Sequence, residues 1–222
     1  MNSEYKFHMK PADALQQLKN GNFRFVNNLK LNRDLLEQVN ETKDNQFPFA
    51  AILSCMDSRT SAELIFDQGL GDVFSIRVAG NVVSPDILGS LEYAAGVVGS
   101  CLIVVLGHTG CGAIKAACDD VEMGQITGIM EKIKPAIAME HSVTQDRTGN
   151  NQKYVDAVSK HNINNSVKAI MEQSDIIKQL VEDGKVGIMP AIYDVATGKV
   201  TFYDADCVMR NAAEKTNSHV AA

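Results

Sequence analysis

Two short clusters of thiol, imidazole, carboxylate and guanidinium side chains could do chemistry in this sequence. The first reads CMDSR over residues 55–59, and the second reads HTGCG over residues 108–112. Two thiolates and an imidazole suit zinc as ligands and suit magnesium or calcium poorly. Cys55, His108 and Cys111 therefore form a candidate zinc site, and Asp57 or a water molecule could complete a tetrahedral set of four ligands.

Each of these residues also has an ordinary structural interpretation. A cysteine at the end of a buried strand is usually a small core residue. Asp57 and Arg59 could form a surface ion pair, and His108 could cap a helix or lie in the core. Cys55 could instead be a thiol nucleophile, as in phosphatase loops, but a carboxylate two residues away would oppose a low thiol pKa and an incoming phosphate. The occurrence of both clusters in one chain favours the metal site.

The apolar segments before the clusters indicate how the clusters are positioned. Largely apolar runs cover residues 49–53, 73–78 and 101–106, as is typical of strands buried in a parallel sheet. Helical patterns over residues 62–68, 87–98 and 112–123 separate them and predict βαβ units. Each cluster thus follows the carboxyl end of a strand, where open α/β sheets bind ligands if the strand order reverses. If strands 49–53 and 101–106 are neighbours, both clusters open onto one crevice.

The rest of the chain predicts helices before the sheet and a hairpin after it. Pro11 suits the start of one or two helices that run to residue 28, with Gly21 as a break, and residues 30–45 form a short helix or loop. Two or three helices follow between residues 127 and 183, with an exposed connection over 142–153. Residues 186–193 and 199–203 flank a turn and predict a hairpin.

We therefore predict an α/β fold with a mainly parallel central sheet, in which four parallel strands are joined by a C-terminal antiparallel edge strand, flanked by helices. The chain is expected to form one domain over residues 1–222. Within it, residues 1–45 would form an N-terminal helical arm, 46–210 the zinc-binding core and 211–222 a polar tail.

The composition excludes several classes of protein. The 222 residues carry a net charge of −6, which offers no electrostatic footprint for nucleic acid or an anionic membrane. A hydrophobic fraction of 45% is enough for a core. No apolar run approaches the roughly 20 residues of a bilayer span. The chain start lacks the apolar region of a secretory signal, so we expect a cytoplasmic protein, or a periplasmic one if a leader was removed before this numbering.

Five cysteines, an odd number, argue against a disulfide framework. Two of them, Cys55 and Cys111, are the candidate zinc thiolates. Ordinary packing is the interpretation of the other three, which are Cys101, Cys118 and Cys207.

Together, the two clusters resemble the motifs of the β-class carbonic anhydrases. CMDSR fits the C-x-D-x-R motif and HTGCG fits the H-x-x-C motif, and the similarity extends from about Pro11 to the hairpin near Asp204. The resemblance implies one zinc ion per chain, held by Cys55, His108 and Cys111. It also implies reversible hydration of carbon dioxide to bicarbonate and a proton, by attack of zinc-bound hydroxide in an apolar pocket.

The resemblance assigns a catalytic dyad to Asp57 and Arg59. Asp57 bound to the zinc would close the site, as a fourth ligand in place of water. Asp57 held by Arg59 would leave the site open and orient the attacking water. Because two thiolates neutralise the charge of the zinc, the water should be less acidic than in a three-histidine site, and activity should favour alkaline pH.

The resemblance also implies a substrate pocket and an assembly. Gln46, Phe74 and Tyr93 match the plant-type subgroup, in which these residues help to line the pocket at a dimer interface. Ala79, Gly80 and Gly112 would sit near the zinc and keep the cavity small. The N-terminal helices would pack on a partner, in a homodimer or in a tetramer made of two dimers.

A second subgroup of the family carries a regulatory bicarbonate pocket made of a tryptophan, an arginine and a tyrosine. Arg77 and Tyr193 occupy two of these positions, but Ile52 stands at the tryptophan position. The sequence therefore argues against this kind of regulation and favours the plant-type arrangement.

Three other functions stay open at this point. The same fold and zinc could hydrolyse COS or CS₂, which needs only altered access to the site. The zinc could be structural, in a binding or scaffold module with a closed four-ligand site. A cysteine phosphatase or redox protein is the third alternative, which metal content and thiol alkylation would test.

Overall fold

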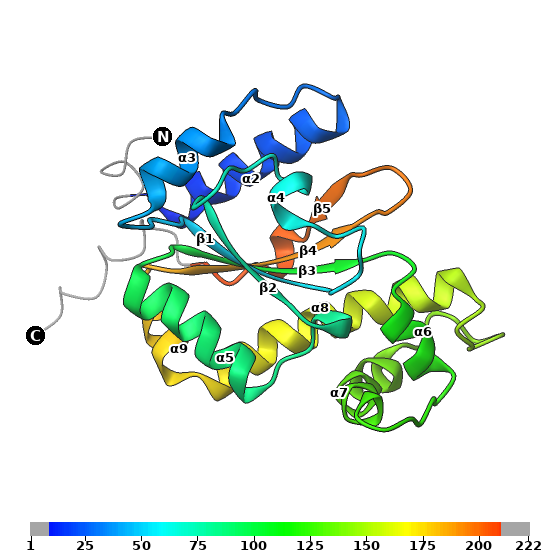
Figure 1. The fold of residues 1–222 in the computed structure, drawn as a ribbon. Helices are drawn as coiled ribbons and strands as arrows, with labels where there is room; N and C mark the ends of the chain where they lie inside the picture. The colour runs from blue at the N-terminus through cyan, green and yellow to red at the C-terminus, as the bar shows by residue number, and fades with distance from the viewer. Residues whose placement is uncertain (1–8, 210–222) are drawn as a thin grey trace, which may run out of the picture.

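The computed structural model describes residues 9–209. Within this range the sheet has the strand order β2-β1-β3-β4-β5 (Figure 1). The strands are β1 (Ala50–Ser54), β2 (Val73–Arg77), β3 (Leu102–His108), β4 (Gly187–Tyr193) and β5 (Val200–Phe202). The first four are parallel to one another, and β5 pairs antiparallel with β4. The predicted fold class and the C-terminal hairpin are thereby confirmed.

The two strands that precede the chemical clusters lie side by side at the centre of the sheet. β1 pairs with β3 from Ala50 opposite Leu102 to Ser54 opposite Leu106. Every residue of both strands is buried, which explains their continuous apolar sequences. From β1 the chain goes to β2 at the edge, and it then returns to β3 on the other side of β1. The strand order therefore reverses between β1 and β3, and both clusters follow strands that meet there.

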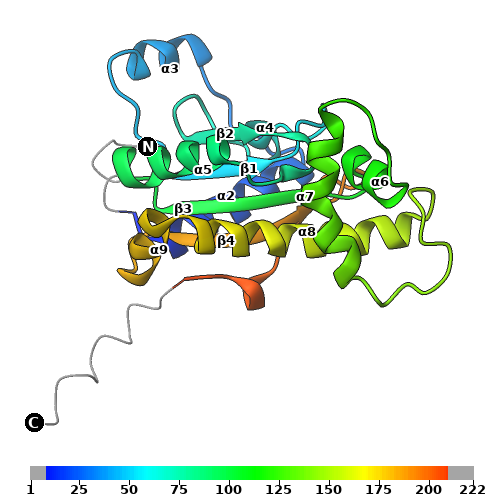
Figure 2. The ribbon, with the colours of Figure 1, turned by 90° about the horizontal axis from the view of Figure 1, so that it is seen from below.

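Helices cover both faces of the sheet (Figures 1 and 2). They are α2 (Pro11–Val26), α3 (Leu35–Thr42), α4 (Ala62–Ile65), α5 (Pro85–Glu92), α6 (Gly112–Cys118), α7 (Ile126–Met139), α8 (Gln152–Gln173) and α9 (Asp175–Glu182). Alternate strand residues face opposite sides. Ile52 and Val104 pack against α2 and α4, whereas Leu53 and Val105 pack against α5, α8 and α9. A third apolar cluster joins α6, α7 and the start of α8 beyond the carboxyl ends of the strands.

The predicted break at Gly21 is wrong, because α2 runs through this residue. A Cβ at Gly21 would lie 1.8 Å from the carbonyl oxygen of Phe66. The glycine therefore allows α2 to lie directly against the backbone that follows α4, and Leu15 and Leu18 of α2 are buried there. The buried face of α2 thus packs on the sheet of its own chain.

Two other predicted helices are shorter than their sequence patterns, and a third changes its helix type. The helix expected over 62–68 ends at Ile65, the one expected over 112–123 ends at Cys118, and the one expected over 87–98 continues as a π-helical turn, η2 (Tyr93–Val98). A left-handed residue follows each of these ends: Asp67 with φ 45°, Asp120 with φ 53° and Gly99 with φ 90°. The predicted helices between residues 127 and 183 are α7, α8 and α9.

The N-terminal arm stands partly away from the body. Asp34 caps α3 by accepting hydrogen bonds from the backbone amides of Leu36 and Glu37. Figure 2 shows α3 projecting from the rest of the molecule, and within residues 9–209 none of its own residues is buried. The predicted polar tail over 211–222 lies outside the described residues. Among those that are described, no helix has the length and apolarity needed to cross a bilayer.

Candidate metal centre

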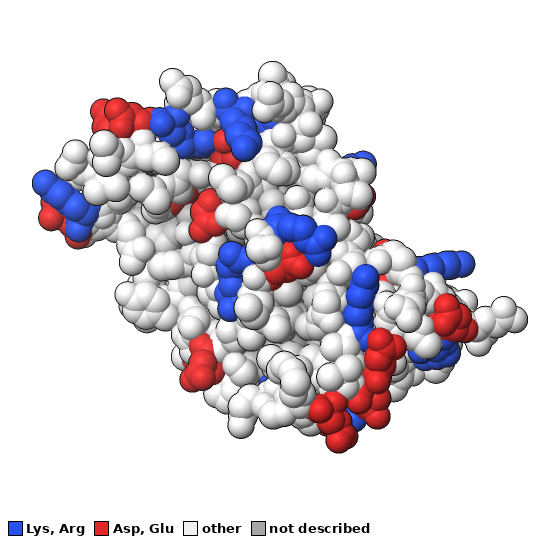
Figure 3. All heavy atoms as spheres, turned by 45° about the vertical axis from the view of Figure 1, so that its right-hand side comes forward, with Lys and Arg blue, Asp and Glu red and all other residues white. Residues whose placement is uncertain are grey.

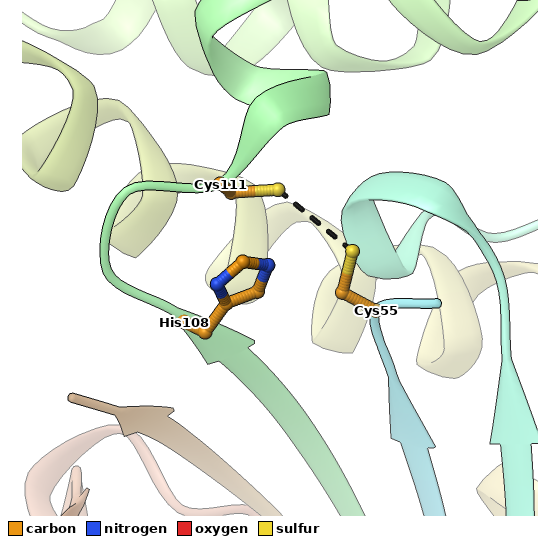
Figure 4. A group of neighbouring side chains, drawn as sticks. All are labelled: Cys55, His108 and Cys111. Carbon is orange, nitrogen blue, oxygen red and sulfur yellow. Dashed lines mark hydrogen bonds between the residues drawn. The ribbon is translucent and has the colours of Figure 1, made fainter. Parts of the chain in front are cut away.

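The three predicted metal ligands meet at the point where the strand order reverses (Figure 4). Cys55 follows β1, His108 is the last residue of β3, and Cys111 is the N-cap of α6. All three side chains are buried, and their donor atoms lie within 4.8 Å of one another. The two sulfur atoms are 3.9 Å apart. Residues from two distant parts of the chain thus form one small cluster of soft ligands.

The imidazole of His108 is oriented as a metal ligand. Its Nδ1 lies 3.0 Å from the carbonyl oxygen of Thr109, so Nδ1 carries the proton and donates it. Nε2 then presents a lone pair, and this buried atom has no hydrogen-bond partner within residues 9–209. A buried polar atom without a partner costs about 1–3 kcal/mol. A metal ion at the cluster would satisfy it, and a nitrogen beside two sulfurs is a donor set that fits zinc.

The ionisation of the Cys55 thiol and that of the Cys111 thiol depend on each other. A hydrogen bond with Cys111 lowers the pKa of Cys55, which favours Cys55 over Cys111 as the thiolate. The same hydrogen bond and burial raise the pKa of Cys111 far above its usual value. A cation between the two sulfurs would favour the thiolate form of both.

Asp57 and Arg59 form a two-pronged ion pair beside the cluster. Nε and Nη2 of Arg59 donate to the two carboxylate oxygens of Asp57 at 2.9 and 2.8 Å, and the backbone amide of Arg59 donates to Oδ1 at 3.0 Å. The Arg59 guanidinium holds the pKa of the Asp57 carboxyl well below its usual range. Oδ2 of Asp57 lies 3.9 Å from Nε2 of His108. The carboxylate therefore borders the cluster while it is turned toward Arg59.

Two side chains outside the predicted zinc site and dyad hold the loop after β1. Oγ1 of Thr60 donates to the carbonyl oxygens of Cys55 and Asp57 at 2.8 and 2.9 Å. Nη2 of Arg77 donates to the Asp57 carbonyl oxygen at 2.6 Å. Arg77, which the sequence placed in the bicarbonate pocket of another subgroup, here holds the backbone of the 55–57 loop. Ile52 is fully buried within β1.

Two of the predicted substrate residues lie next to the cluster. Ala79 begins a short turn, η1 (Ala79–Asn81), and the backbone amide of Gly80 in this turn reaches the Cys55 sulfur. Nδ2 of Asn162, on α8, donates to the Gly80 carbonyl oxygen at 2.8 Å. No sequence pattern signalled this contact, because residues 80 and 162 meet only in the folded chain. Gly112 directly follows Cys111, and a Cβ there would meet no described atom within 4 Å.

The other predicted substrate residues lie away from the cluster. Phe74 is opposite Ala51 in the sheet, four residues before the level of Cys55, which is about 13 Å along a strand. Tyr93 packs edge-on against Phe74, with ring centroids 6.4 Å apart. Gln46 is exposed before β1 and lines a hollow with residues of α3. These three residues thus lie apart from the ligand cluster within the described chain.

Charge is not concentrated at this side of the molecule. Figure 3 turns forward the side that carries α6 and α7, and acidic and basic side chains alternate there with wide uncharged areas. Several acidic side chains gather only along the lower edge of this face, with basic ones beside them (Figure 3).

The chain is similar to known carbonic anhydrases. The sequence profile of the carbonic anhydrase family matches residues 50–200. The carbonic anhydrase of Mycolicibacterium smegmatis is 36% identical over 196 residues, which span 86% of this chain and 92% of the relative. Carbonic anhydrase 2 of Mycobacterium tuberculosis is 34% identical over 200 residues, which span 87% and 93% of the two chains.

Solved structures show the same fold. The β-carbonic anhydrase CafA of Aspergillus fumigatus superposes with a TM-score of 0.68 and 23% identity, over 87% of this chain and 90% of that one. A tetrameric β-carbonic anhydrase of Sordaria macrospora superposes with a TM-score of 0.67 and 21% identity, over 76% and 90% of the two chains. At these identities the likeness is one of fold.

Proposed function

The chain belongs to the β-class carbonic anhydrase family, and on that premise we propose that it hydrates carbon dioxide reversibly to bicarbonate and a proton, with one zinc ion per chain. The observation that carries this proposal is the buried group of Cys55, His108 and Cys111, in which Nε2 of His108 has no partner in the described part of the chain. The curated relatives at 34–36% identity, which are carbonic anhydrases, support it.

The proposed zinc ligands are the two sulfurs and Nε2 of His108. Zinc, when bound, supplies Lewis acidity, which lowers the pKa of a coordinated water enough to make it a nucleophile near neutral pH. The protein's part is to present three ligands and to leave one position open, as catalytic zinc sites do. The pairing of Asp57 with Arg59 supports this open arrangement, because the carboxylate is engaged outside the three-residue group.

Asp57 is proposed to orient the attacking water. The two donors of Arg59 fix both oxygens of the carboxylate and keep it ionised. An ionised carboxylate can accept a hydrogen bond from the water and direct its lone pair toward the carbon of CO₂. Arg59 would act through Asp57, by preventing the carboxylate from turning toward the ligand cluster.

We further propose that the working enzyme is a homodimer or a tetramer of two dimers. Phe74 and Tyr93, with Ile76 and Pro85, line an open groove of about 550 Å³ that is distant from the metal ligands of the same chain. A second copy could bring such a groove and the exposed Gln46 to the site. The side chains of Leu35 and Leu36 on α3 are 57% and 78% exposed, which also supports an interface at the arm.

The proposed reaction is tested by stopped-flow CO₂ hydration of the zinc-loaded protein between neutral and alkaline pH, with CS₂ turnover measured in parallel. We expect CO₂ hydration that rises with pH. Turnover of CS₂ without hydration of CO₂ would mean that the protein hydrolyses sulfur compounds such as CS₂ instead. Zinc-loaded protein that is inactive on both substrates would favour a structural metal.

The proposed role of Asp57 is tested with the Asp57→Ala variant. We expect this variant to keep a full equivalent of zinc and to lose about 100-fold in CO₂ hydration, as is typical when a positioned group is removed. Cys55→Ser is the matched ligand variant, which should instead lose zinc affinity. Near-wild-type hydration by zinc-loaded Asp57→Ala would contradict the proposed dyad.

A further inference from the structure

The loop that carries two of the three proposed zinc ligands is held from both sides by other parts of the chain. On one side, the backbone amide of Thr109 donates to the carbonyl oxygen of Tyr193 at 2.9 Å. Oγ1 of Thr109 accepts from the amide of Val195 at 3.1 Å. On the other side, the amide of Gly110 donates to Oδ1 of Asp156 at 3.0 Å. The loop is thus clamped between the β4–β5 turn and α8.

The bond to Asp156 lies at the residue on which the loop geometry depends. Gly110 has φ 63°, a left-handed conformation that an L side chain rarely adopts. The amide of Gly110 finds its acceptor outside the loop, at Oδ1 of Asp156. A carboxylate is a strong acceptor for a backbone amide.

Asp156 is itself fixed in position. Its Oδ1 also accepts from Nε2 of Gln152, one turn earlier on α8, at 2.7 Å. On either side of Asp156, Val155 and Val158 are fully buried in the apolar cluster that contains Cys55 and Cys111. Core packing of α8 therefore sets where the carboxylate meets the loop.

We propose that Asp156 is a positioning residue of the metal centre, which holds the Gly110 amide so that His108 and Cys111 direct their donor atoms to the same point. This inference rests on the proposed metal site. Loss of the carboxylate would let the four-residue loop relax before the metal binds. Groups that orient metal ligands typically contribute about 10–100-fold to metal affinity.

A second carboxylate in the structure provides a matched control. Oδ1 of Asp119 accepts from the amide of Gly149 at 2.7 Å, so the donor and acceptor types are the same. This bond lies after the C-terminal end of α6 and holds the connection between α7 and α8, not the loop over 108–111. Removing it should reduce stability without a direct effect on the ligands.

The experiment measures the zinc dissociation constant by competition with a chromophoric chelator, together with the thiolate-to-metal charge-transfer bands of the Co²⁺-substituted protein. We expect Asp156→Ala to weaken zinc binding at least about tenfold and to shift the Co²⁺ bands. Asp156→Asn, whose amide oxygen can still accept, should restore most of the affinity. Asp119→Ala should bind zinc within about twofold of wild type.

Three results would overturn the proposal. They are wild-type zinc affinity in Asp156→Ala, an equal loss of affinity in Asp119→Ala, and no recovery in Asp156→Asn. If the alanine variant does not fold, Asp156→Leu removes the acceptor with a bulkier helix-forming side chain. Failure of the wild-type protein to bind zinc would refute the proposed function, whereas equal binding by wild type and Asp156→Ala would refute only the role of Asp156.

Discussion

Gly107 is the position where a single added methyl group should reveal how closely α8 packs on the strand that ends at the metal centre. It precedes His108 in β3, and a Cβ at this position would lie 2.6 Å from Cδ1 and 2.7 Å from Cγ1 of Ile163. Carbon atoms in contact are normally about 3.5–4.0 Å apart. Ile163 is fully buried, so Gly107→Ala forces a displacement of about 1 Å upon Ile163 or upon α8.

The expected free energies follow from this overlap. Overpacking of this size costs about 1–3 kcal/mol, and replacing a glycine returns about 0.4–1 kcal/mol by restricting the unfolded chain. Gly107→Ala should therefore lower the free energy of unfolding by about 1–2 kcal/mol. Ile163→Ala alone should cost about 3 kcal/mol through the cavity it creates. In the double variant the new methyl group enters that cavity, so the total loss should be about 2–3 kcal/mol.

The assay is urea unfolding of the wild type, both single variants and the double variant, followed by far-UV circular dichroism. The double-mutant cycle should give an interaction energy of at least about 1 kcal/mol in the direction of rescue. Additivity within about 0.5 kcal/mol would refute the packing argument. A Gly107→Ala variant as stable as wild type would refute it as well.

Two further predictions concern charge. Burial raises the pKa of Asp67, but the hydrogen bonds from Arg24 and Arg33 outweigh burial and lower this pKa. Asp67→Asn should therefore lower the free energy of unfolding by about 3 kcal/mol at pH 7. This difference, measured by urea unfolding, should disappear as pH falls from about 4, the unfolded-state pKa, through the lower folded-state value. In metal-free protein at pH 7.5, iodoacetamide that reaches the buried Cys55 should modify it before Cys118 and Cys207, because the hydrogen bond with Cys111 lowers the pKa of Cys55 whereas burial raises the pKa values of Cys118 and Cys207 to about 11. Zinc should protect Cys55, and peptide mass spectrometry that finds Cys118 modified first would contradict this.

The centre of the sheet could be predicted from the sequence because every residue of its two central strands is buried. β1 and β3 are covered by helices on both faces, so their sequences are continuously apolar and easily recognised. Once these strands are neighbours, the clusters that follow them must meet. The candidate metal ligands could therefore be placed together without a structure.

What could not be predicted depends on contacts between distant segments. Gly21 has the sequence signature of a helix break, but close packing on the Phe66 backbone keeps it within α2. The roles of Asn162 and Asp156 follow from where α8 crosses the two loops, and no local pattern encodes that crossing. Phe74 matches a family pattern for a pocket at a dimer interface; it lies opposite Ala51, away from the ligands of its own chain, and its part in a substrate pocket stays a prediction.

The complete burial of β1 and β3 has a consequence for how the proposed zinc ion would bind and dissociate. The most buried strands of a domain open least often, and their backbone amides exchange with solvent only on global unfolding. The ligands at their ends therefore stand on the slowest-opening part of the fold. In zinc fingers, by contrast, the metal itself supplies the folding free energy. In this protein the ligand cluster forms with the sheet, so we expect the proposed zinc ion to be removable, or replaceable by another ion, while the chain stays folded.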